Sequence, residues 1–330
     1  MERGGSARST LRGMIDGYRA SQIVCVASEL GLADLVKAGA SSYVELAART
    51  GANPAALRRL LRALCGLGIF DHVAPDGVAL NQLSELLLRD AKGSLDPWAR
   101  TVLDQFYAGW GALHQSVMNG RTGFETVRGA DAWTHRARNP KSGRLFNDAM
   151  ASLAPELAQA VLEVCDFSVF RDVVDVGGGD GRFAAELLRA HPLLRATVQD
   201  RSAPDAPPAD LHDRMSLVRD DFLVRVPGGA DCYVLSRVLH DWDDETALRI
   251  LRNVAAAMST ASALVLVERV LPPESASVEA ALSDINMMVM NGGRERTLEE
   301  FRALLSAAGL ELARALPTAS ILSLILSSRR

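Results

Sequence analysis

The residues most suggestive of chemistry lie in the stretch 173–181, where four glycines follow a short run of valines and an aspartate. A buried strand, a glycine turn and a helix in this order are typical of the first unit of a nucleotide-binding α/β sheet. Glycine is needed because the backbone turns sharply and a ligand comes close. The dinucleotide spacing G-x-G-x-x-G fails at Arg182, and no Gly-Lys-Ser/Thr follows as in a P-loop. The alternative is a glycine turn that binds nothing.

The charges beside the glycines indicate which ligand this turn suits. Asp175 and Asp180 flank the turn, and their carboxylates would repel a pyrophosphate. They suit a ligand with positive charge, and S-adenosylmethionine carries both an ammonium and a sulfonium group. We therefore expect this cofactor. We expect no metal, because no group of His, Cys and carboxylate residues is spaced along the chain as metal ligands are.

Further polar residues follow the next two expected strands, 197–199 and 216–218. Asp200 comes about twenty residues after the glycines, where an acid can accept hydrogen bonds from both ribose hydroxyls. Asp221 and Phe222 follow the third strand. Phe222 could stack on the adenine ring while Asp221 accepts a hydrogen bond from the adenine amino group.

A histidine and two carboxylates follow later strands of the same expected sheet. The fourth strand, 230–235, is followed by Ser236, Arg237, His240, Asp241 and Trp242. Glu268 ends the fifth strand, and Glu295 lies in a loop after the apolar stretch 285–290. In such a sheet the ligands bind outside the carboxyl ends of the strands. A lone histidine is more often structural, but His240, Glu268 and Glu295 together on one edge are unusual by chance.

The alternation of strands and helices after residue 171 predicts an α/β domain with a mostly parallel, doubly wound sheet. Helices are expected at 183–190, 243–258 and 298–308, and a final strand at 321–326. A helix at 146–164 leads into the glycine stretch, and residues 130–140 are expected to be a polar connection. We expect two domains, residues 1–100 and 101–330.

The first hundred residues resemble a winged helix. Residues 1–12 are expected to be disordered and 14–36 helical. Ser42 and Asn53-Pro54 are helix-start signals for helices at 43–48 and 54–67, and the turn 74–77 joins two short strands into a hairpin. A winged helix raises the hypothesis of a DNA-binding regulator, with Arg58, Arg59 and Arg62 on the helix that would enter the major groove. We favour a packing helix with a solvated face, because the basic footprint typical of DNA-binding domains is weak here.

Composition narrows the remaining classes. The 330 residues are 48% hydrophobic, ample for a core, and the net charge of −4 does not point to nucleic acid or an anionic membrane. Apolar runs are too short to span a bilayer, and residues 1–12 lack a secretory signal. The four cysteines are scattered without C-x-x-C spacing, which indicates free thiols. We therefore expect a cytoplasmic protein.

Several stretches make the chain resemble the small-molecule O-methyltransferases, which include plant caffeic acid and flavonoid enzymes and bacterial antibiotic-tailoring enzymes. The matching stretches are 56–64, 146–150, 174–181, 221–222, Leu-Ser-Arg-Val-Leu-His-Asp-Trp-Asp-Asp-Glu at 235–245 and Asn-Gly-Gly-Arg-Glu-Arg-Thr at 291–297. They cover nearly the whole chain, and the last two are the most specific.

The resemblance implies an S-adenosylmethionine-dependent O-methyltransferase that acts on a hydroxyl, phenolic by expectation, of an aromatic small molecule in natural-product biosynthesis. It implies a Rossmann-like class I methyltransferase sheet and a homodimer formed by the winged-helix domain, which also helps close the partner's substrate pocket. His240 matches the catalytic base, flanked by Glu268 and Glu295. The expected cofactor contacts are Gly177, Gly179, Asp200, Asp221, Phe222, Ser236 and Arg237. The expected substrate contacts are Met150, Asp241, Trp242, Met287 and Asn291. Several plant members have a lysine where this chain has Ser236, so the contact made by that lysine is in doubt.

Three other hypotheses stay open beside this one. An enzyme of the same fold could transfer the methyl group to nitrogen, although a histidine with two flanking acids favours a hydroxyl. A relative could have lost transfer, which the retained His240, Glu268 and Glu295 argue against. A winged-helix protein could sense a small molecule without catalysis.

Overall fold

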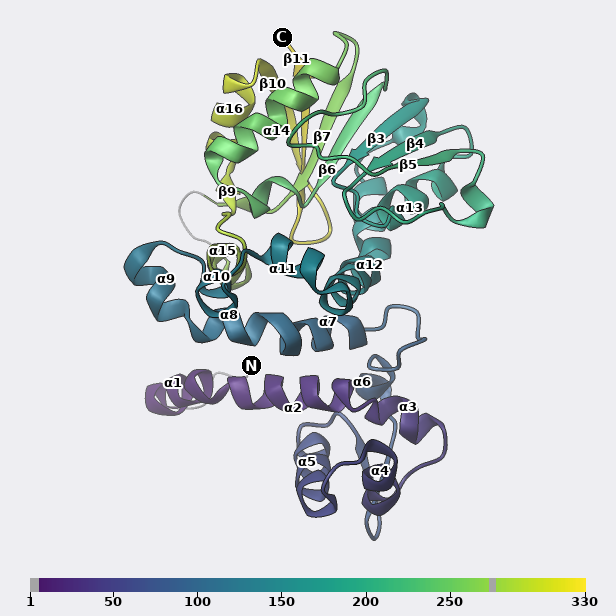
Figure 1. Cartoon of the computed structure of the whole chain (residues 1–330), viewed down its shortest axis with the longest axis vertical. Coiled ribbons are helices and arrows are strands. Elements are labelled where there is room, and N and C mark those ends of the chain that lie inside the picture. Colours follow the sequence, from purple (N-terminus) through teal and green to yellow (C-terminus); the bar gives the residue numbers. More distant parts are fainter. Residues whose placement is uncertain (1–5, 273–276) are drawn as a thin grey trace. The chain divides into compact units, whose positions relative to one another are not determined.

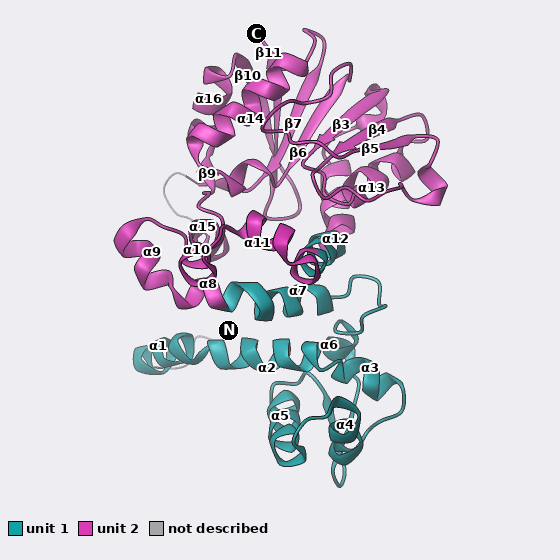
Figure 2. Ribbon diagram, viewed as in Figure 1, with its two compact units in different colours: residues 1–107, 144–152 teal, residues 108–143, 153–330 magenta. Residues whose placement is uncertain are grey.

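The structure is a computed structural model that describes residues 6–272 and 277–330. The chain divides into two compact units, residues 1–107 with 144–152 and residues 108–143 with 153–330 (Figure 2). The segment 144–152 belongs to α12 (Pro140–Leu162), whose C-terminal part lies in the second unit. The domain boundary at residue 100 remains a prediction.

The first unit is mostly helical, as the sequence predicts. Its elements are α1 (Ala7–Asp16), α2 (Tyr18–Glu29), α3 (Leu32–Lys37), α4 (Tyr43–Thr50), α5 (Pro54–Gly66), β1 (Asp71–Val73), β2 (Gly77–Ala79), α6 (Gln82–Glu85), α7 (Asp96–Thr101) and the π-helix η1 (Val102–Phe106). The expected start signals act as caps. Ser42 and Glu45 form a capping box on α4, and the Asn53 side chain accepts a 3.0 Å hydrogen bond from the Ala56 N–H.

One expectation for the N-terminal stretch is confirmed and one is wrong. Residues 14–36 are helical as expected, in three helices, because α1, α2 and α3 are separated at Gly17 and near Gly31, whose φ of 63° is left-handed. Residues 7–12 are not disordered, because they form the start of α1, which Ser6 caps. Residues 1–5 lie outside the described residues.

The second unit contains the predicted α/β sheet (Figure 1). In the described residues the sheet has seven strands in the order β10-β11-β7-β6-β3-β4-β5. The strands are β3 (Asp172–Val176), β4 (Arg195–Gln199), β5 (Met215–Val218), β6 (Cys232–Ser236), β7 (Ala263–Glu268), β10 (Leu310–Pro317) and β11 (Ser323–Arg329). The five strands from β5 to β7 are parallel, and β11 pairs antiparallel with both β7 and β10. The predicted doubly wound sheet is therefore confirmed, with an antiparallel pair at one edge.

Helices cover both faces of this sheet, because successive strand residues point to opposite sides. Val173 packs in the core beneath α13 (Arg182–Ala190) and the C-terminal part of α12. Its neighbour Val174 packs in the opposite core, beneath α14 (Asp244–Ala257) and α16 (Leu298–Ala307). The sheet is therefore packed on both faces beneath the loops at its carboxyl edge.

Some elements of the second unit differ from the expectations. Residues 130–140 are not merely a polar connection, because α11 (Ala132–Arg138) forms there with Asp131 as its N-cap. The final strand is two residues later at its start and extends to Arg329. The unit also contains α8 (Tyr107–Gly111), α9 (Leu113–Asn119), α10 (Gly123–Arg128), β8 (Val270–Leu271), α15 (Val278–Met290) and β9 (Arg296–Thr297). Across the described residues, none of the helices is both long and apolar enough to traverse a bilayer.

Candidate active site

The parallel register brings the carboxyl ends of β3 to β7 to one edge of the second unit's sheet. Val176 of β3 is level with Gln199 of β4, and Gln199 with Val218 of β5. Ser236 of β6 is level with Val267 of β7. The residues that follow these strands therefore emerge side by side, at the edge where ligands bind in such sheets.

The glycine turn after β3 is shaped by close contacts. Gly177 and Gly179 have left-handed φ values of 73° and 60°. A Cβ on Gly177 would lie 2.9 Å from Val238 and 3.3 Å from the ring of Phe222. The N–H of Gly179 donates a 3.1 Å hydrogen bond to Oδ2 of Asp200. The turn thus brings together residues from the ends of β3, β4, β5 and β6.

Beside this turn, the expected cofactor contacts Asp200 and Asp221 accept hydrogen bonds from residues two positions further along the chain. Oδ1 of Asp200 accepts hydrogen bonds of 2.7 Å from the Ser202 N–H and hydroxyl. Oδ1 of Asp221 accepts one of 2.8 Å from the Leu223 N–H. Among the described residues, the buried hydroxyl of Ser236 has no hydrogen-bond partner. Arg237 has a left-handed φ of 55°, a strained conformation for a side-chain-bearing residue that occurs preferentially at functional sites.

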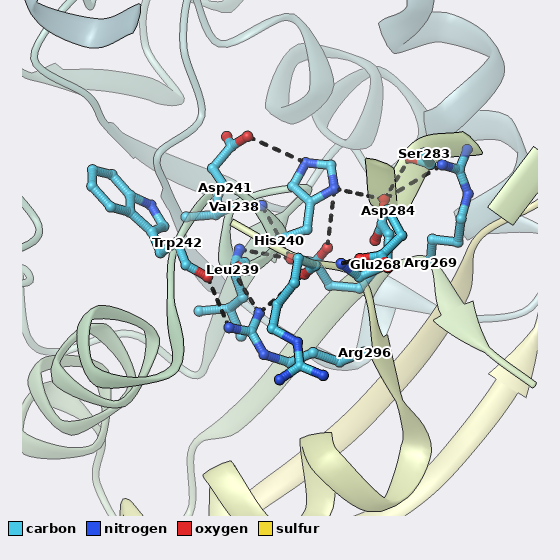
Figure 3. A network of polar contacts seen from close by, with 12 residues as sticks. Val238, Leu239, His240, Asp241, Trp242, Glu268, Arg269, Ser283, Asp284 and Arg296 are labelled. Atoms are coloured by element: carbon cyan, nitrogen blue, oxygen red, sulfur yellow. Dashed lines mark hydrogen bonds and ion pairs between the residues drawn. The ribbon is translucent and has the colours of Figure 1, made fainter. Parts of the chain in front are cut away.

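His240 lies among three carboxylates (Figure 3). Its Nδ1 is 3.2 Å from Oε1 of Glu295 and 4.0 Å from Oε2 of Glu268, and its Nε2 is 3.8 Å from Oδ1 of Asp241. In Figure 3 the contacts leave the two ring nitrogens in opposite directions, one toward Asp241 and the other toward the side of Glu268. The fold therefore assembles the histidine and the two glutamates that the sequence places far apart.

Each glutamate is fixed by donors of its own. Oε1 of Glu268 accepts hydrogen bonds from the N–H groups of Val238 and Leu239, at 3.1 and 2.8 Å. Oε1 of Glu295 accepts a 2.6 Å bond from Ser283 and lies 3.4 Å from the Arg269 guanidinium. Both glutamates are almost fully buried, so their positions are set by these donors and by packing.

The stretch 292–297 holds the backbone around His240. The Arg294 N–H donates a 2.9 Å hydrogen bond to the His240 carbonyl. The fully buried Arg296 donates to the carbonyls of Leu239 and Trp242, each at 2.8 Å. One buried guanidinium thus clamps both ends of the turn that carries His240.

The surroundings shift the pKa values of this cluster. Burial alone would lower the pKa of His240, but the carboxylates of Asp241, Glu268 and Glu295 outweigh burial and raise the pKa to about 9. Burial raises the pKa of Glu268 to about 7, against the attraction of His240. Burial also acts on Glu295, but its hydrogen bond with His240 prevails and lowers the pKa. His240 and Glu295 are therefore best described as an imidazolium–carboxylate pair in the free protein.

Four of the expected substrate contacts lie in the second unit, and the fifth, Met150, lies in the first. Oδ1 of Asp241 accepts a 2.5 Å hydrogen bond from Asn291, the C-cap of α15. Met287 is buried one turn earlier in the same helix. The Trp242 ring packs edge-on against Phe222, with ring centroids 6.2 Å apart. Met150 lies on α12 within residues 144–152 of the first unit.

Sequence reasoning missed several residues of this site. Trp133, from the stretch expected to be a connection, stacks on Trp242 with ring centroids 6.0 Å apart and an interplanar angle of 15°. Ser283 and Arg269 hold Glu295, but nothing in their spacing indicated it. Gly293 and Arg296 lie within the motif Asn-Gly-Gly-Arg-Glu-Arg-Thr at 291–297, so their importance could have been inferred from the sequence, although their partners could not.

Comparisons with known proteins agree on the family. Residues 110–311 match the O-methyltransferase domain, and residues 13–90 match the O-methyltransferase dimerisation domain. A phenazine O-methyltransferase from Lysobacter antibioticus is 37% identical, covering 96% of this chain and 95% of that protein. A phenazine-1-carboxylate N-methyltransferase from Pseudomonas aeruginosa is 34% identical, covering 94% and 93%.

A solved structure is also similar throughout. It is an O-methyltransferase from neocarzinostatin biosynthesis, in complex with S-adenosylmethionine and 2-hydroxy-5-methyl naphthoic acid. It has a TM-score of 0.81 at 29% identity and covers 94% of this chain and 96% of its own. With a catalytic and a dimerisation domain both matched, this chain belongs to the family of S-adenosylmethionine-dependent O-methyltransferases.

Proposed function

We propose that this O-methyltransferase methylates a phenolic hydroxyl of an aromatic small molecule, with His240 as general base. The supporting observation is the 3.2 Å contact of His240 Nδ1 with Glu295. In the unprotonated form of His240, a proton held on Nδ1 by that carboxylate leaves the lone pair on Nε2, which can take the proton of the acceptor hydroxyl. The glutamates then stabilise the imidazolium that forms, as the acid of a catalytic triad does.

The residues beneath the glycine turn fit the cofactor. Both carboxylate oxygens of Asp175 are buried and without hydrogen-bond partners among the described residues, and Asp180 and Asp200 lie near enough to raise its pKa further. Uncompensated negative charge of this kind favours a cationic ligand. S-adenosylmethionine, when bound, supplies an electrophilic methyl group next to a sulfonium. Gly177, Gly179, Asp200, Asp221, Phe222, Ser236 and Arg237 are the residues that we propose hold it.

The free energy needed to ionise a phenol at neutral pH explains why a general base is useful in this reaction. A phenol has a pKa near 10, so at pH 7 only about one molecule in a thousand is ionised, a handicap of about 4 kcal/mol. A positioned general base typically contributes about 10²- to 10⁴-fold, which offsets most of that. Holding the oxygen close to the methyl carbon can contribute about 7–11 kcal/mol more. Asp241, Trp242, Met287, Asn291 and Met150 are the proposed positioning residues. This chemistry needs no metal, so a chelator should leave turnover intact. Turnover that is abolished by a chelator and restored by added magnesium would contradict this expectation.

Replacement of His240 tests the proposal. His240→Ala should keep cofactor affinity but lower turnover on a weakly acidic phenol by about 10²- to 10⁴-fold. The loss should shrink for an acceptor whose hydroxyl is already acidic, because an ionised acceptor needs no base. The acceptor panel should include phenols, naphthols and polycyclic quinones, with methyl transfer followed by mass spectrometry. Near wild-type turnover of a folded variant on a weakly acidic phenol would refute the role of His240.

Transfer to nitrogen is the second candidate, because one relative is named an N-methyltransferase. A ring nitrogen with a free lone pair has no proton to lose, so a base adds little. His240 with its flanking acids therefore favours the hydroxyl. An assay that offers hydroxylated and nitrogen-heterocyclic acceptors side by side separates the two, and a preference for nitrogen that survives His240→Ala would favour this second candidate.

We also propose that the matched dimerisation domain forms a homodimer. Four large apolar side chains of α1 and α2 are exposed, Leu11, Met14, Ile15 and Tyr18, and such patches mark interfaces. Light scattering at micromolar concentration should give the dimer mass.

A DNA-binding regulator is disfavoured, because Arg58 is paired with Asp76 at 2.7 Å and lies over the Tyr43 ring. Specific retention on duplex DNA at physiological salt would revive that hypothesis.

A further inference from the structure

The side chains around His240 have the composition of a metal site. Ligand atoms of His240, Glu268 and Glu295 all lie within 4.8 Å of one another. One imidazole and two carboxylates are ligand types that zinc accepts. The spacing of these residues along the chain gives no hint of such a group. The fold creates it by bringing the loop after β6, the end of β7 and the loop before β9 together.

A second observation concerns the free oxygens of the two glutamates. Among the described residues, Oε2 of Glu268 and Oε2 of Glu295 are buried without a hydrogen-bond partner. The exposed fractions of the two glutamate residues are 0% and 1%. The Oε1 atoms, in contrast, accept bonds from backbone N–H groups and from Ser283. In metal sites a carboxylate commonly binds the ion through one oxygen while neighbouring donors hold the rest of the group.

We propose that this cluster binds a borderline divalent ion such as Zn²⁺ or Co²⁺, and that the ion inhibits methyl transfer. The ion takes the place of the proton between Nδ1 of His240 and the two carboxylates. A neutral imidazole with a metal on Nδ1 carries its remaining proton on Nε2. Nε2 is then a donor and cannot accept the hydroxyl proton. The inhibition rests on the proposed role of His240 as base, whereas the binding does not.

The nature of the ligands predicts which ions bind. A nitrogen ligand with two carboxylates favours Zn²⁺, Co²⁺ and Ni²⁺, whereas Mg²⁺ and Ca²⁺ prefer a larger set of oxygen ligands. Binding requires His240 and Glu268 to be deprotonated, so affinity should increase with pH. Magnesium and calcium should neither bind here nor inhibit.

Cobalt titration followed by visible absorption tests the binding without any turnover. We expect the intense d–d bands of low-coordinate Co²⁺, without the thiolate charge-transfer band that binding to any of the four free cysteines would give. Glu268→Gln and Glu295→Gln should weaken binding about 10- to 100-fold or more, since loss of even a supporting residue costs that much. Glu186→Gln is the matched control, because Glu186 pairs with Arg189 on α13. Cofactor affinity by calorimetry reports that each variant is folded. Equal cobalt binding by wild type and both glutamate variants, or no low-coordinate spectrum at all, would overturn the site.

Inhibition by zinc tests the second part of the proposal, namely that the bound ion inhibits methyl transfer. Turnover on a weakly acidic phenol should fall as the site fills and return with a chelator, while an acceptor that is already ionised should be affected less. Cobalt that binds as described, yet leaves turnover on the weakly acidic phenol unchanged, would keep the site and overturn both the inhibition and the role of His240 as base.

Discussion

Gly293 lies directly against the backbone of His240, so closely that any Cβ at Gly293 would overlap the His240 carbonyl oxygen and would lie 2.7 Å from the Trp242 nitrogen. The neighbouring Arg294 N–H bonds that same carbonyl at 2.9 Å. The glycine is therefore a requirement of packing. It lets the loop before β9 approach the turn that carries the histidine.

Gly293→Ala should consequently displace His240 and Glu295 relative to each other. A misplacement of about 1 Å at a reacting centre can cost about 10²-fold in rate, so we expect a loss of turnover of about 10- to 100-fold. Cofactor affinity should change little. Gly228→Ala is the control, since its nearest atom would be at an ordinary 3.6 Å. A Gly293→Ala variant with unchanged kinetics would show that the turn can relax without moving the histidine.

The pH dependence of kcat/KM should follow His240. Its pKa is raised to about 9 by the surrounding carboxylates, and only the unprotonated imidazole can act as base. The rate should therefore decrease as pH falls below about 9, well above the reference value of about 6.5. Glu295→Gln removes one carboxylate, so the limb should move to lower pH while the maximal rate also decreases. A limb that stays in place in Glu295→Gln would mean that another group titrates.

Asp200→Ala should weaken cofactor binding by about 1–3 kcal/mol, the cost of leaving buried hydrogen-bonding groups unpaired. The same change also removes the acceptor of the Gly179 N–H at 3.1 Å, so part of the loss comes from a less ordered glycine turn. Acceptor affinity should be nearly unchanged. Calorimetry with the cofactor measures the first effect, and unaltered affinity would mean that the ribose assignment is wrong.

How much the sequence predicts depends on whether a feature is local. Asn53-Pro54 fixed the start of α5 because capping acts within four residues. The run of valines in β3 correctly predicted a strand that is buried on both faces. β10 was missed because half of its residues are exposed at the sheet edge and it carries no continuous apolar run. α11 was missed because Trp133 is the only large apolar side chain among its seven residues, although Asp131 was an available start signal.

The same distinction between local and distant features applies to the residues of the site. The motif Leu-His-Asp-Trp and the glycine-arginine stretch identified His240 and Glu295 as members of one edge, because chain order fixes which strand end each residue follows. The partners that hold them could not be read. Ser283 reaches Glu295 from α15, and Arg296 reaches two carbonyls more than fifty residues earlier, at Leu239 and Trp242. Such contacts depend on how α15 and the loop after β6 pack, which no spacing encodes.

The stability of the protein should depend on pH through Asp175, which lies beneath the glycine turn. Burial, together with Asp200 and Asp180, raises the pKa of this carboxyl to about 7. Because the folded-state pKa lies above the unfolded value of about 3.9, the native state binds this proton more tightly. The associated stability is fully present below about pH 4 and is lost as pH rises to about 7, amounting to about 4 kcal/mol. Asp175→Asn cannot titrate, so its free energy of unfolding should lack this decline.

The comparison is best made as a difference between wild type and Asp175→Asn, measured by urea unfolding without cofactor from about pH 4 to about pH 8. Titrating groups that do not interact with Asp175 cancel in that difference, and the constant cost of burying an unpaired amide, about 1–3 kcal/mol, does not change its slope. The variant should gain relative stability with rising pH, yet bind S-adenosylmethionine more weakly, because the carboxylate that strains the free protein is the charge proposed to attract the cofactor's cation. Parallel stability curves would place the titration of Asp175 outside this range. Unchanged cofactor affinity would show that the charge of Asp175 does not attract the cofactor's cation.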